Sequence, residues 1–119
     1  YLTKSVRAAN LQTVWTHKDT PMSTPMTRES AKQLQQMMVS VVNNGTGRNA
    51  RISGVTVGGK TGTAQTSPDK PPYAWFVGWS DKPKVAVAVF VESSNKERSE
   101  IAGGRLGAPI ARDVIEALR

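Results

Sequence analysis

The 119-residue sequence contains no cysteine and a single histidine, His17. The absence of cysteine excludes a disulfide framework, a thiolate metal site and a cysteine nucleophile. One histidine in a polar stretch gives no basis for a zinc site, because such sites combine several His or Cys ligands. No nucleophile-elbow pattern accompanies it, so a Ser-His-Asp triad has no support either. We therefore predict neither a metal nor another cofactor.

Long apolar runs are also absent. No stretch approaches the roughly 18 apolar residues of a membrane-spanning helix, and no signal peptide opens the chain, which begins at Tyr1. The length suits one compact domain. Because the first residue is not methionine, we expect an internal or processed piece of a longer protein.

Acidic residues are few, with 9 Asp and Glu against 16 Lys and Arg, for a net charge of +7. A basic balance permits nucleic acid, an anionic membrane surface or an acidic polymer as a partner. The positive charges are scattered, without the dense run or aromatic-rich motif of nucleic-acid-binding proteins. We expect a solvated basic surface with no nucleic-acid partner, compatible with an anionic cell wall.

Apolar periodicity and turn residues predict the main elements. Residues 1–26 are expected to be extended and loop-rich, with one short strand near 11–16. A helix is expected over Arg28–Asn44, with Thr27 as its N-cap and Gly45 as a left-handed stop. Its predicted buried face comprises Ala31, Leu34, Met38 and Val41 or Val42. Three strands are expected over residues 52–66, 73–80 and 84–92, and a closing helix over 104–119.

The short connections predict antiparallel neighbours. Valines alternate with alanines and Phe90 along the third strand, so both of its faces are apolar. We expect that strand to lie inside the sheet, covered on both sides. The predicted buried face of the closing helix comprises Ile110, Val114, Ala117 and Leu118. The predicted fold class is α/β (α+β), with helices packed on an antiparallel sheet.

The stretch from Val55 to Thr66, VTVGGKTGTAQT, carries the clearest chemistry. Lys60 lies between glycines and two hydroxyls, Thr61 and Thr63, and Gly62 separates the hydroxyls. Glycines remove bulk and allow another backbone or a ligand to approach the strand edge. An ammonium group and directed hydroxyl donors suit a carboxylate. The alternative is an ordinary glycine-rich edge strand with an exposed lysine.

The chain resembles the class B penicillin-binding proteins, most closely the actinobacterial penicillin-binding protein A type. Lys60 to Gln65 resembles the K-T-G motif of penicillin-binding transpeptidases and serine β-lactamases. The segment from Asn43 to Ala50 is similar to the GTG segment that precedes this motif. The family's next two strands and closing helix resemble residues 74–79, 85–92 and 103–115, and Tyr1-Leu2 resembles its "PYL" segment. The resemblance implies a β-lactamase/transpeptidase-like fold.

The resemblance also implies a mechanism. In this family a serine attacks the penultimate D-alanyl carbonyl of a peptidoglycan stem peptide, an acyl-enzyme forms, and β-lactams block the serine. By resemblance, Lys60 provides positive field for the terminal carboxylate and helps proton transfer, and Thr61 and Thr63 bind that carboxylate. Gly62 leaves space for the ligand, the Thr63 N–H is an oxyanion donor, and Tyr73 lines the cleft.

The nucleophile has no convincing counterpart in this chain. Ser67 and Lys70 fit S-x-x-K only as letters, because they lie in a proline-rich loop and not on a helix. Ser93-Ser94-Asn95 fits S-x-N, and Ser93 with Lys96 fits S-x-x-K. Both of these patterns follow the third strand, whereas the family places them before K-T-G. We therefore expect no nucleophile in this chain.

Residues 1–119 are accordingly expected to be the C-terminal portion of one transpeptidase domain. Its expected partners are the preceding part of that domain, stem peptides and β-lactam antibiotics. The expected location is the extracytoplasmic face of the bacterial membrane, behind an N-terminal anchor. The alternatives are a D,D-carboxypeptidase or β-lactamase, a penicillin-sensing domain, and a basic module that binds cell wall or nucleic acid.

Overall fold

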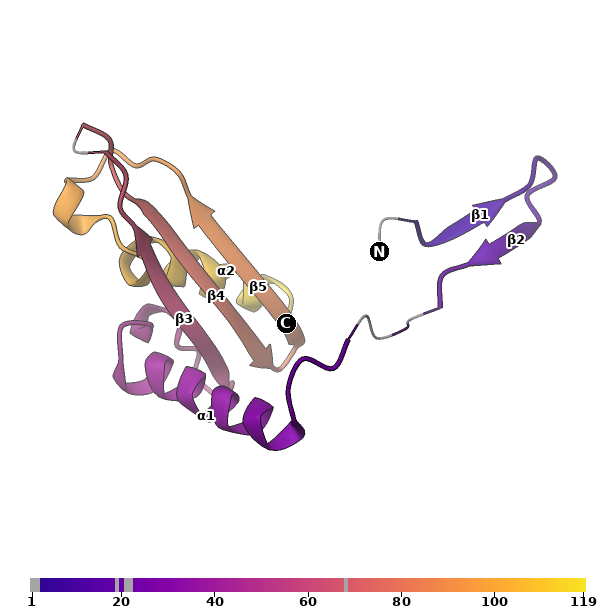
Figure 1. Ribbon diagram of the computed structural model, residues 1–119, viewed down its shortest axis with the longest axis horizontal. Coiled ribbons are helices and arrows are strands. Elements are labelled where there is room, and N and C mark those ends of the chain that lie inside the picture. The colour runs from indigo at the N-terminus through magenta and orange to yellow at the C-terminus, as the bar shows by residue number, and fades with distance from the viewer. Residues whose placement is uncertain (1–2, 19, 21–22, 68) are drawn as a thin grey trace.

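The computed structural model describes residues 3–18, 20, 23–67 and 69–119. Its main body is a three-stranded antiparallel sheet with two helices, and a two-stranded hairpin stands apart from it (Figure 1). The strands are β1 (Ser5–Arg7), β2 (Thr13–Thr16), β3 (Val57–Ala64), β4 (Tyr73–Asp81) and β5 (Lys84–Val91). The helices are α1 (Arg28–Asn44) and α2 (Ala108–Ala117), with short helical turns at Arg48–Ala50, Arg98–Glu100 and Gly103–Gly107. The predicted α+β class is confirmed.

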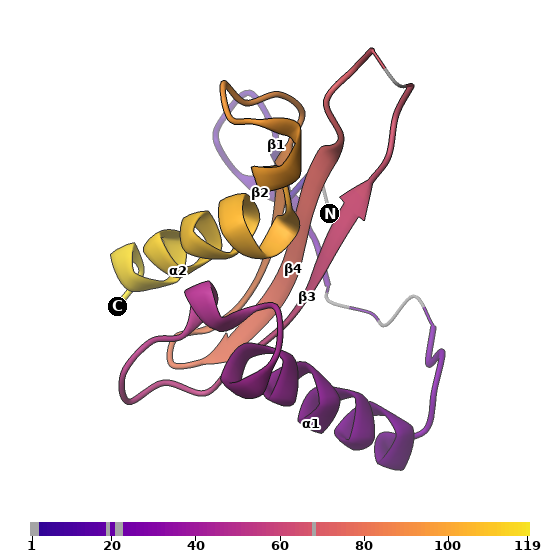
Figure 2. The same ribbon diagram turned by 90° about the vertical axis from the view of Figure 1, so that its left-hand side faces the viewer.

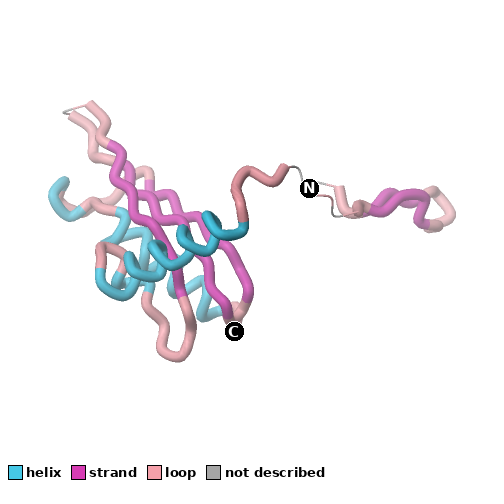
Figure 3. Tube along the Cα trace, turned by 60° about the horizontal axis from the view of Figure 1, so that its bottom comes forward, coloured by secondary structure: helices cyan, strands magenta, loops and turns pink. Residues whose placement is uncertain are grey.

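The hairpin pairs β1 with β2 in antiparallel register. Figures 1 and 3 both show it well away from the main sheet, joined to α1 by the intervening chain. The strand expected near residues 11–16 is present as β2, whereas β1 was not predicted. Tyr1-Leu2, which carried part of the family resemblance, lies outside the described residues.

Helix α1 has the predicted bounds. The Thr27 Oγ1 accepts a hydrogen bond from the Ser30 N–H at 3.1 Å, which caps the first turn. The prediction for Gly45 is wrong: its φ is −108°, so it is extended and not left-handed. The predicted buried face is only partly confirmed, because Val42 is buried but Leu34 is 42% exposed. Helix α1 packs against β3, the edge strand of the sheet, and runs across the direction of that strand (Figure 2).

The sheet has the order β3-β4-β5 and two unlike faces. The valines of β5 and Phe76 of β4 point toward α2, and Phe76 is fully buried there. On the opposite face Trp75 and Phe90 are 42% and 46% exposed. Strand β5 was expected inside the sheet, but among the described residues it pairs only with β4 and its alanine face is open.

Helix α2 is shorter than predicted and is turned differently. A π-helical turn occupies Gly103–Gly107, and Pro109 lies in the first turn of α2, where the missing N–H costs nothing. The buried residues of α2 are Ala108, Ala111 and Ile115. The predicted face is wrong, since its members Ile110, Val114 and Leu118 are 45%, 43% and 56% exposed.

The small side chains explain the orientation of α2. A helix packs closely where alanines face its partner, and here Ala108 and Ala111 join Phe76 in the core. Within the described part of the chain, no helix is both long enough and apolar enough to cross a membrane.

Candidate active site

The K-T-G residues lie on β3, an edge strand of the main sheet. Lys60 is opposite Val77 and Thr61 is opposite Phe76 in the β3–β4 pairing. Because side chains alternate along a strand, Lys60 and Gly62 share one face, while Thr61 and Thr63 share the face toward α2. The four residues are thus contiguous, but the ammonium group and the two hydroxyls leave the strand in different directions.

The structure shows why glycine is needed at the two positions before Lys60, which the sequence alone did not reveal. A Cβ on Gly58 would lie 2.5 Å from the Trp79 indole, and a Cβ on Gly59 would lie 2.3 Å from the Phe76 ring. Both distances are too short for non-bonded atoms. The space that these glycines open is therefore filled by two aromatic side chains of β4, one on each face.

Lys60 is exposed, and its Nζ donates to the Thr61 carbonyl oxygen at 2.5 Å. Its stem borders a cavity of about 470 Å³ between α1 and the sheet. The other residues that line this cavity are Leu34, Met37, Met38, Val41, Gly59 and Val77.

Thr61 is half-buried, and its hydroxyl lies 2.7 Å from the hydroxyl of Thr46. Gly62 is held closely as well: a Cβ on Gly103 would lie 2.7 Å and 2.8 Å from its carbonyl oxygen and amide nitrogen. Thr63 is exposed. The Gly103 turn therefore supports the motif strand at Gly62 and leaves the hydroxyl of Thr63 accessible.

Tyr73 begins β4 opposite Ala64, just beyond the K-T-G residues. It lies on the same face of the sheet as Lys60, by the alternation of side chains. Its ring meets that of Phe90 edge-on at 5.3 Å, and Phe90 also lies 4.3 Å from Trp75. The structure therefore places Tyr73 at one end of an exposed aromatic cluster beside the motif strand.

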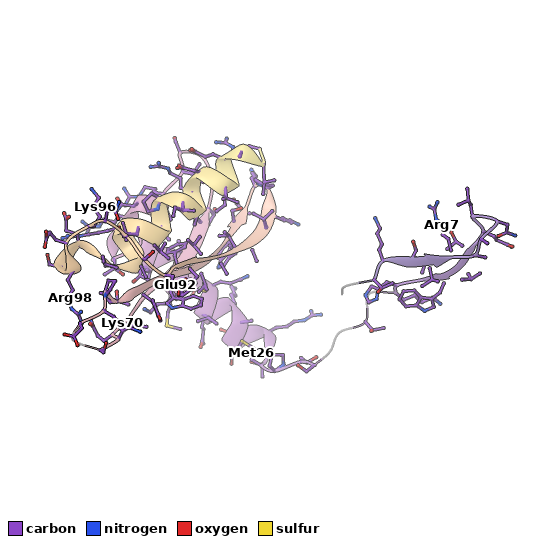
Figure 4. The ribbon with its side chains drawn as sticks, turned by 90° about the horizontal axis from the view of Figure 1, so that it is seen from above. Arg7, Met26, Lys70, Glu92, Lys96 and Arg98 are labelled. Atoms are coloured by element: carbon purple, nitrogen blue, oxygen red, sulfur yellow. The ribbon has the colours of Figure 1, made fainter. Side chains whose placement is uncertain are left out.

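Several residues around the motif were not recognised from the sequence. The Asn49 side-chain amide donates to the Gly104 carbonyl oxygen at 2.8 Å, which joins the turn after α1 to the turn before α2. Arg98 donates to the Lys70 carbonyl oxygen at 2.5 Å and to Gln65 Oε1 at 3.1 Å, and Figure 4 shows Arg98 beside Lys70. The GTG resemblance was the available signal for the first contact. Nothing in the sequence pattern indicated the second.

The serine-containing lookalikes lie in loops. Ser67 and Lys70 lie between β3 and β4, where the Lys70 N–H donates to the Ser67 carbonyl oxygen at 3.1 Å as in a turn. Ser93 to Lys96 follow β5. Neither α1 nor α2 carries a serine and a lysine at the S-x-x-K spacing.

One titratable group near the start of β3 is clearly perturbed. The Thr56 N–H donates to Asp81 Oδ1 at 2.8 Å, and this hydrogen bond lowers the pKa of the Asp81 carboxyl. The contact ties the turn before β3 to the end of β4. Across the described residues, no group of three or more His, Cys, Asp or Glu side chains is placed to hold a metal ion.

Comparison with known proteins decides the family. The family described as "Penicillin binding protein transpeptidase domain" matches residues 1–116. The chain belongs to this family. The predicted class B, penicillin-binding protein A type is confirmed by the relatives that follow.

The peptidoglycan D,D-transpeptidase PbpA of Mycobacterium tuberculosis is 36% identical over 122 residues, covering 98% of this chain and 24% of that protein. Stage V sporulation protein D of Bacillus subtilis is 35% identical over 95 residues, covering 76% of this chain and 15% of that protein. The crystal structure of PBPA from M. tuberculosis superposes with a TM-score of 0.78 at 33% identity, covering 100% of this chain and 28% of that one. The chain thus spans about a quarter of the length of the PbpA proteins.

Proposed function

We propose that this chain forms one wall of the active site of a serine-type D,D-transpeptidase that cross-links peptidoglycan stem peptides and is acylated by β-lactams. The observation that carries the proposal is the K-T-G sequence on an exposed edge strand, supported from behind by the Gly103 turn and from the side by Thr46. The PbpA relatives are peptidoglycan D,D-transpeptidases, and the match to the M. tuberculosis protein covers 98% of this chain.

The residues of β3 have separate roles in this proposal. Lys60 supplies the positive field for the ligand's terminal carboxylate and assists proton transfer at the catalytic hydroxyls. Thr61 and Thr63 donate hydroxyl hydrogen bonds to that carboxylate, Gly62 lets the ligand approach, and Tyr73 borders the cleft. The Thr63 N–H is one donor of the oxyanion hole. A donor of this kind typically contributes about 3 kcal/mol of transition-state stabilisation.

The proposal requires a nucleophile from elsewhere, and we assign it to the preceding part of the same domain. The described residues leave three apolar surfaces open: Trp75, Val77 and Phe90 on the sheet, Ile110, Val114 and Leu118 on α2, and Leu34 and Met37 on α1. Apolar patches of this kind normally mark surfaces that another polypeptide segment covers. Residues 1–119 would then be the C-terminal portion of a domain whose remainder covers these faces and carries the serine.

The cellular setting follows from the same proposal. A peptidoglycan cross-linking enzyme meets its substrate on the extracytoplasmic face of the bacterial membrane, and the net charge of +7 favours contact with an anionic wall. We place the chain there, held by an N-terminal anchor that belongs to the preceding segment.

Substitution of Lys60 tests the proposed site. The material needed is the protein purified from its host together with every polypeptide that copurifies, which we call the native preparation. Lys60→Met should lower the second-order rate constant for acylation by fluorescent penicillin by about 100-fold or more, because a preorganised charge is lost. Lys84→Met, at an exposed position at the start of β5, is the matched control and should acylate normally. Equal rates for the two variants would contradict the role of Lys60.

A further inference from the structure

The hydroxyl of Thr46 contacts a residue of the K-T-G motif directly. Thr46 lies in the turn after α1, 15 positions before Thr61, and the two Oγ1 atoms are 2.7 Å apart. That distance is the usual one for a hydrogen bond between hydroxyls. An element outside the motif strand thus fixes the direction of one of the hydroxyls that we assign to the ligand's carboxylate.

The turn that carries Thr46 is held on two sides. The N–H groups of Gly45 and Gly47 both donate to the Val41 carbonyl oxygen at 3.0 Å, which fixes the turn to the end of α1. Asn49 binds the turn to Gly104. Gly104 approaches so closely that a Cβ there would lie 2.1 Å from the Thr46 carbonyl oxygen. These contacts fix the main chain at Thr46, so the side chain of Thr46 extends from a fixed point beside Thr61.

The hydrogen bond has two possible directions, and they differ in consequence. Each hydroxyl has one proton to donate and lone pairs to accept. If Thr61 donates to Thr46, its proton is used and a carboxylate meets only oxygen lone pairs. If Thr46 donates to Thr61, the Thr61 proton remains free for the carboxylate, and the accepted bond strengthens Thr61 as a donor.

We infer that Thr46 is a positioning residue, which donates to Thr61 and thereby orients the Thr61 hydroxyl as a hydrogen-bond donor to the ligand's carboxylate. This inference rests on the proposed function, since it presupposes that Thr61 binds the carboxylate. Thr46 is exposed and its bond to Thr61 is accessible to water, so the bond contributes little to folding. Its removal should change ligand recognition while leaving stability nearly unchanged.

The test compares two ligands in the native preparation of each variant. Benzylpenicillin carries the carboxylate, and its methyl ester does not. Acylation rate constants for both are measured by competition with fluorescent penicillin, and the acid-to-ester ratio is taken. Thr46→Val should lower the rate for the acid about tenfold, because a charge-assisted hydrogen bond is weakened, and should change the rate for the ester less than about twofold. Thr46→Ser keeps the hydroxyl and should restore the ratio.

Matched variants separate positioning from general disruption. Thr13→Val removes a hydroxyl from the exposed strand β2 and should leave both rates unchanged. Thr61→Val should reduce the ratio at least as much as Thr46→Val does. The double variant should lose no more than Thr61→Val alone, because both changes act on the same Thr61 donor. The ratio does not depend on the active fraction, so a partly unfolded variant still gives a decisive value. Thr46→Ala serves if Thr46→Val fails to fold.

The outcomes separate the two proposals. A wild-type preparation that no penicillin labels would contradict the proposed function. A labelled wild type with a normal acid-to-ester ratio in Thr46→Val, or equal loss for both ligands, would overturn the inference about Thr46 and leave the proposed function standing. A labelled wild type that does not prefer the acid would remove the carboxylate role of Thr61, and the inference with it.

Discussion

Gly103 offers the most direct way to displace the motif strand without touching its residues. A Cβ at this position would lie 2.0 Å from the Trp75 carbonyl oxygen, and less than 3 Å from the Gly62 backbone. Contacts of a Cβ atom shorter than 3.0 Å are essentially never seen in proteins. The Gly103 turn and the strand backbone would therefore have to move apart by about 1 Å. The atoms in the way are backbone atoms of β3 and β4, so no side-chain rotation relieves the contact.

Gly103→Ala should therefore move Gly62 and its neighbours relative to the rest of the site. Overpacking typically costs about 1–3 kcal/mol of stability, and misplacement of a catalytic element by 1 Å can cost about 100-fold in rate. We expect acylation of the native preparation by fluorescent penicillin to fall by about that factor, and the melting temperature to fall with it.

A control at Gly54 separates lost stability from lost geometry. Gly54 has a φ of +74° and no atom near its Cβ position, so Gly54→Ala introduces backbone strain far from any contact. It should cost about 1 kcal/mol of stability and leave the acylation rate of the folded protein unchanged. A Gly103→Ala protein that melts and acylates like the wild type would refute the argument that the Gly103 turn positions β3.

Three further predictions concern stability and are measured on the native preparation. Asp81→Asn should lower the melting temperature at neutral pH, with the difference shrinking below about pH 4. The reason is that a carboxyl whose pKa is lowered by the Thr56 N–H stabilises the fold above its unfolded pKa and loses that contribution as pH falls through the folded one. A pH-independent difference would exclude this cause. Thr27→Ala removes the cap of α1 and should cost about 1 kcal/mol, seen as faster amide exchange in its first turns, whereas Thr27→Ser should exchange like the wild type. Phe76→Ala, at a fully buried ring, should cost about 3–5 kcal/mol in denaturant unfolding, and a cost below 1 kcal/mol would contradict its place at the centre of the core.

Local sequence patterns predicted an element correctly where contacts within a few residues determine its structure. Helix α1 begins after Thr27 and ends at Asn44 as predicted, because a capping hydroxyl and an apolar period act within a few residues. The short turn between β4 and β5 predicted their antiparallel pairing, and alternation along β5 predicted which of its residues share a face. The K-T-G residues were placed on a strand for the same reason.

Predictions failed where the local sequence allows two conformations or two buried faces and tertiary contacts determine which one forms. Helix α2 carries one stripe of larger apolar residues, including Ile110 and Val114, and another with Ala108 and Ala111. The fold buries the alanine stripe because Phe76 already fills the space beneath. Gly45 is not left-handed, because its N–H and that of Gly47 share the Val41 carbonyl oxygen and the chain leaves the helix extended.

The contacts that hold the motif strand in place could not be predicted from the sequence, because they also join residues that are far apart in the chain. Thr46 and Thr61 are 15 residues apart, and Asn49 and Gly104 are 55 residues apart. Neither pair produces a local pattern, so the segment with Thr46 looked like a simple connector. Only the folded arrangement shows that the turns at residues 45–50 and 103–107 meet at Thr61 and Gly62.

The central claim is that this chain contributes the K-T-G wall of a penicillin-reactive site whose nucleophile lies on a preceding segment. The most direct measurement begins by labelling the native preparation with fluorescent penicillin. If residues 1–119 are joined to a preceding segment, the polypeptide is then cleaved just before residue 1. Denaturing electrophoresis separates the polypeptides, and their intact masses are determined. The account predicts the mass of one penicillin on the preceding polypeptide and none on residues 1–119. Label on residues 1–119 themselves would contradict it, and Ser67 and Ser93 would then be the first residues to replace.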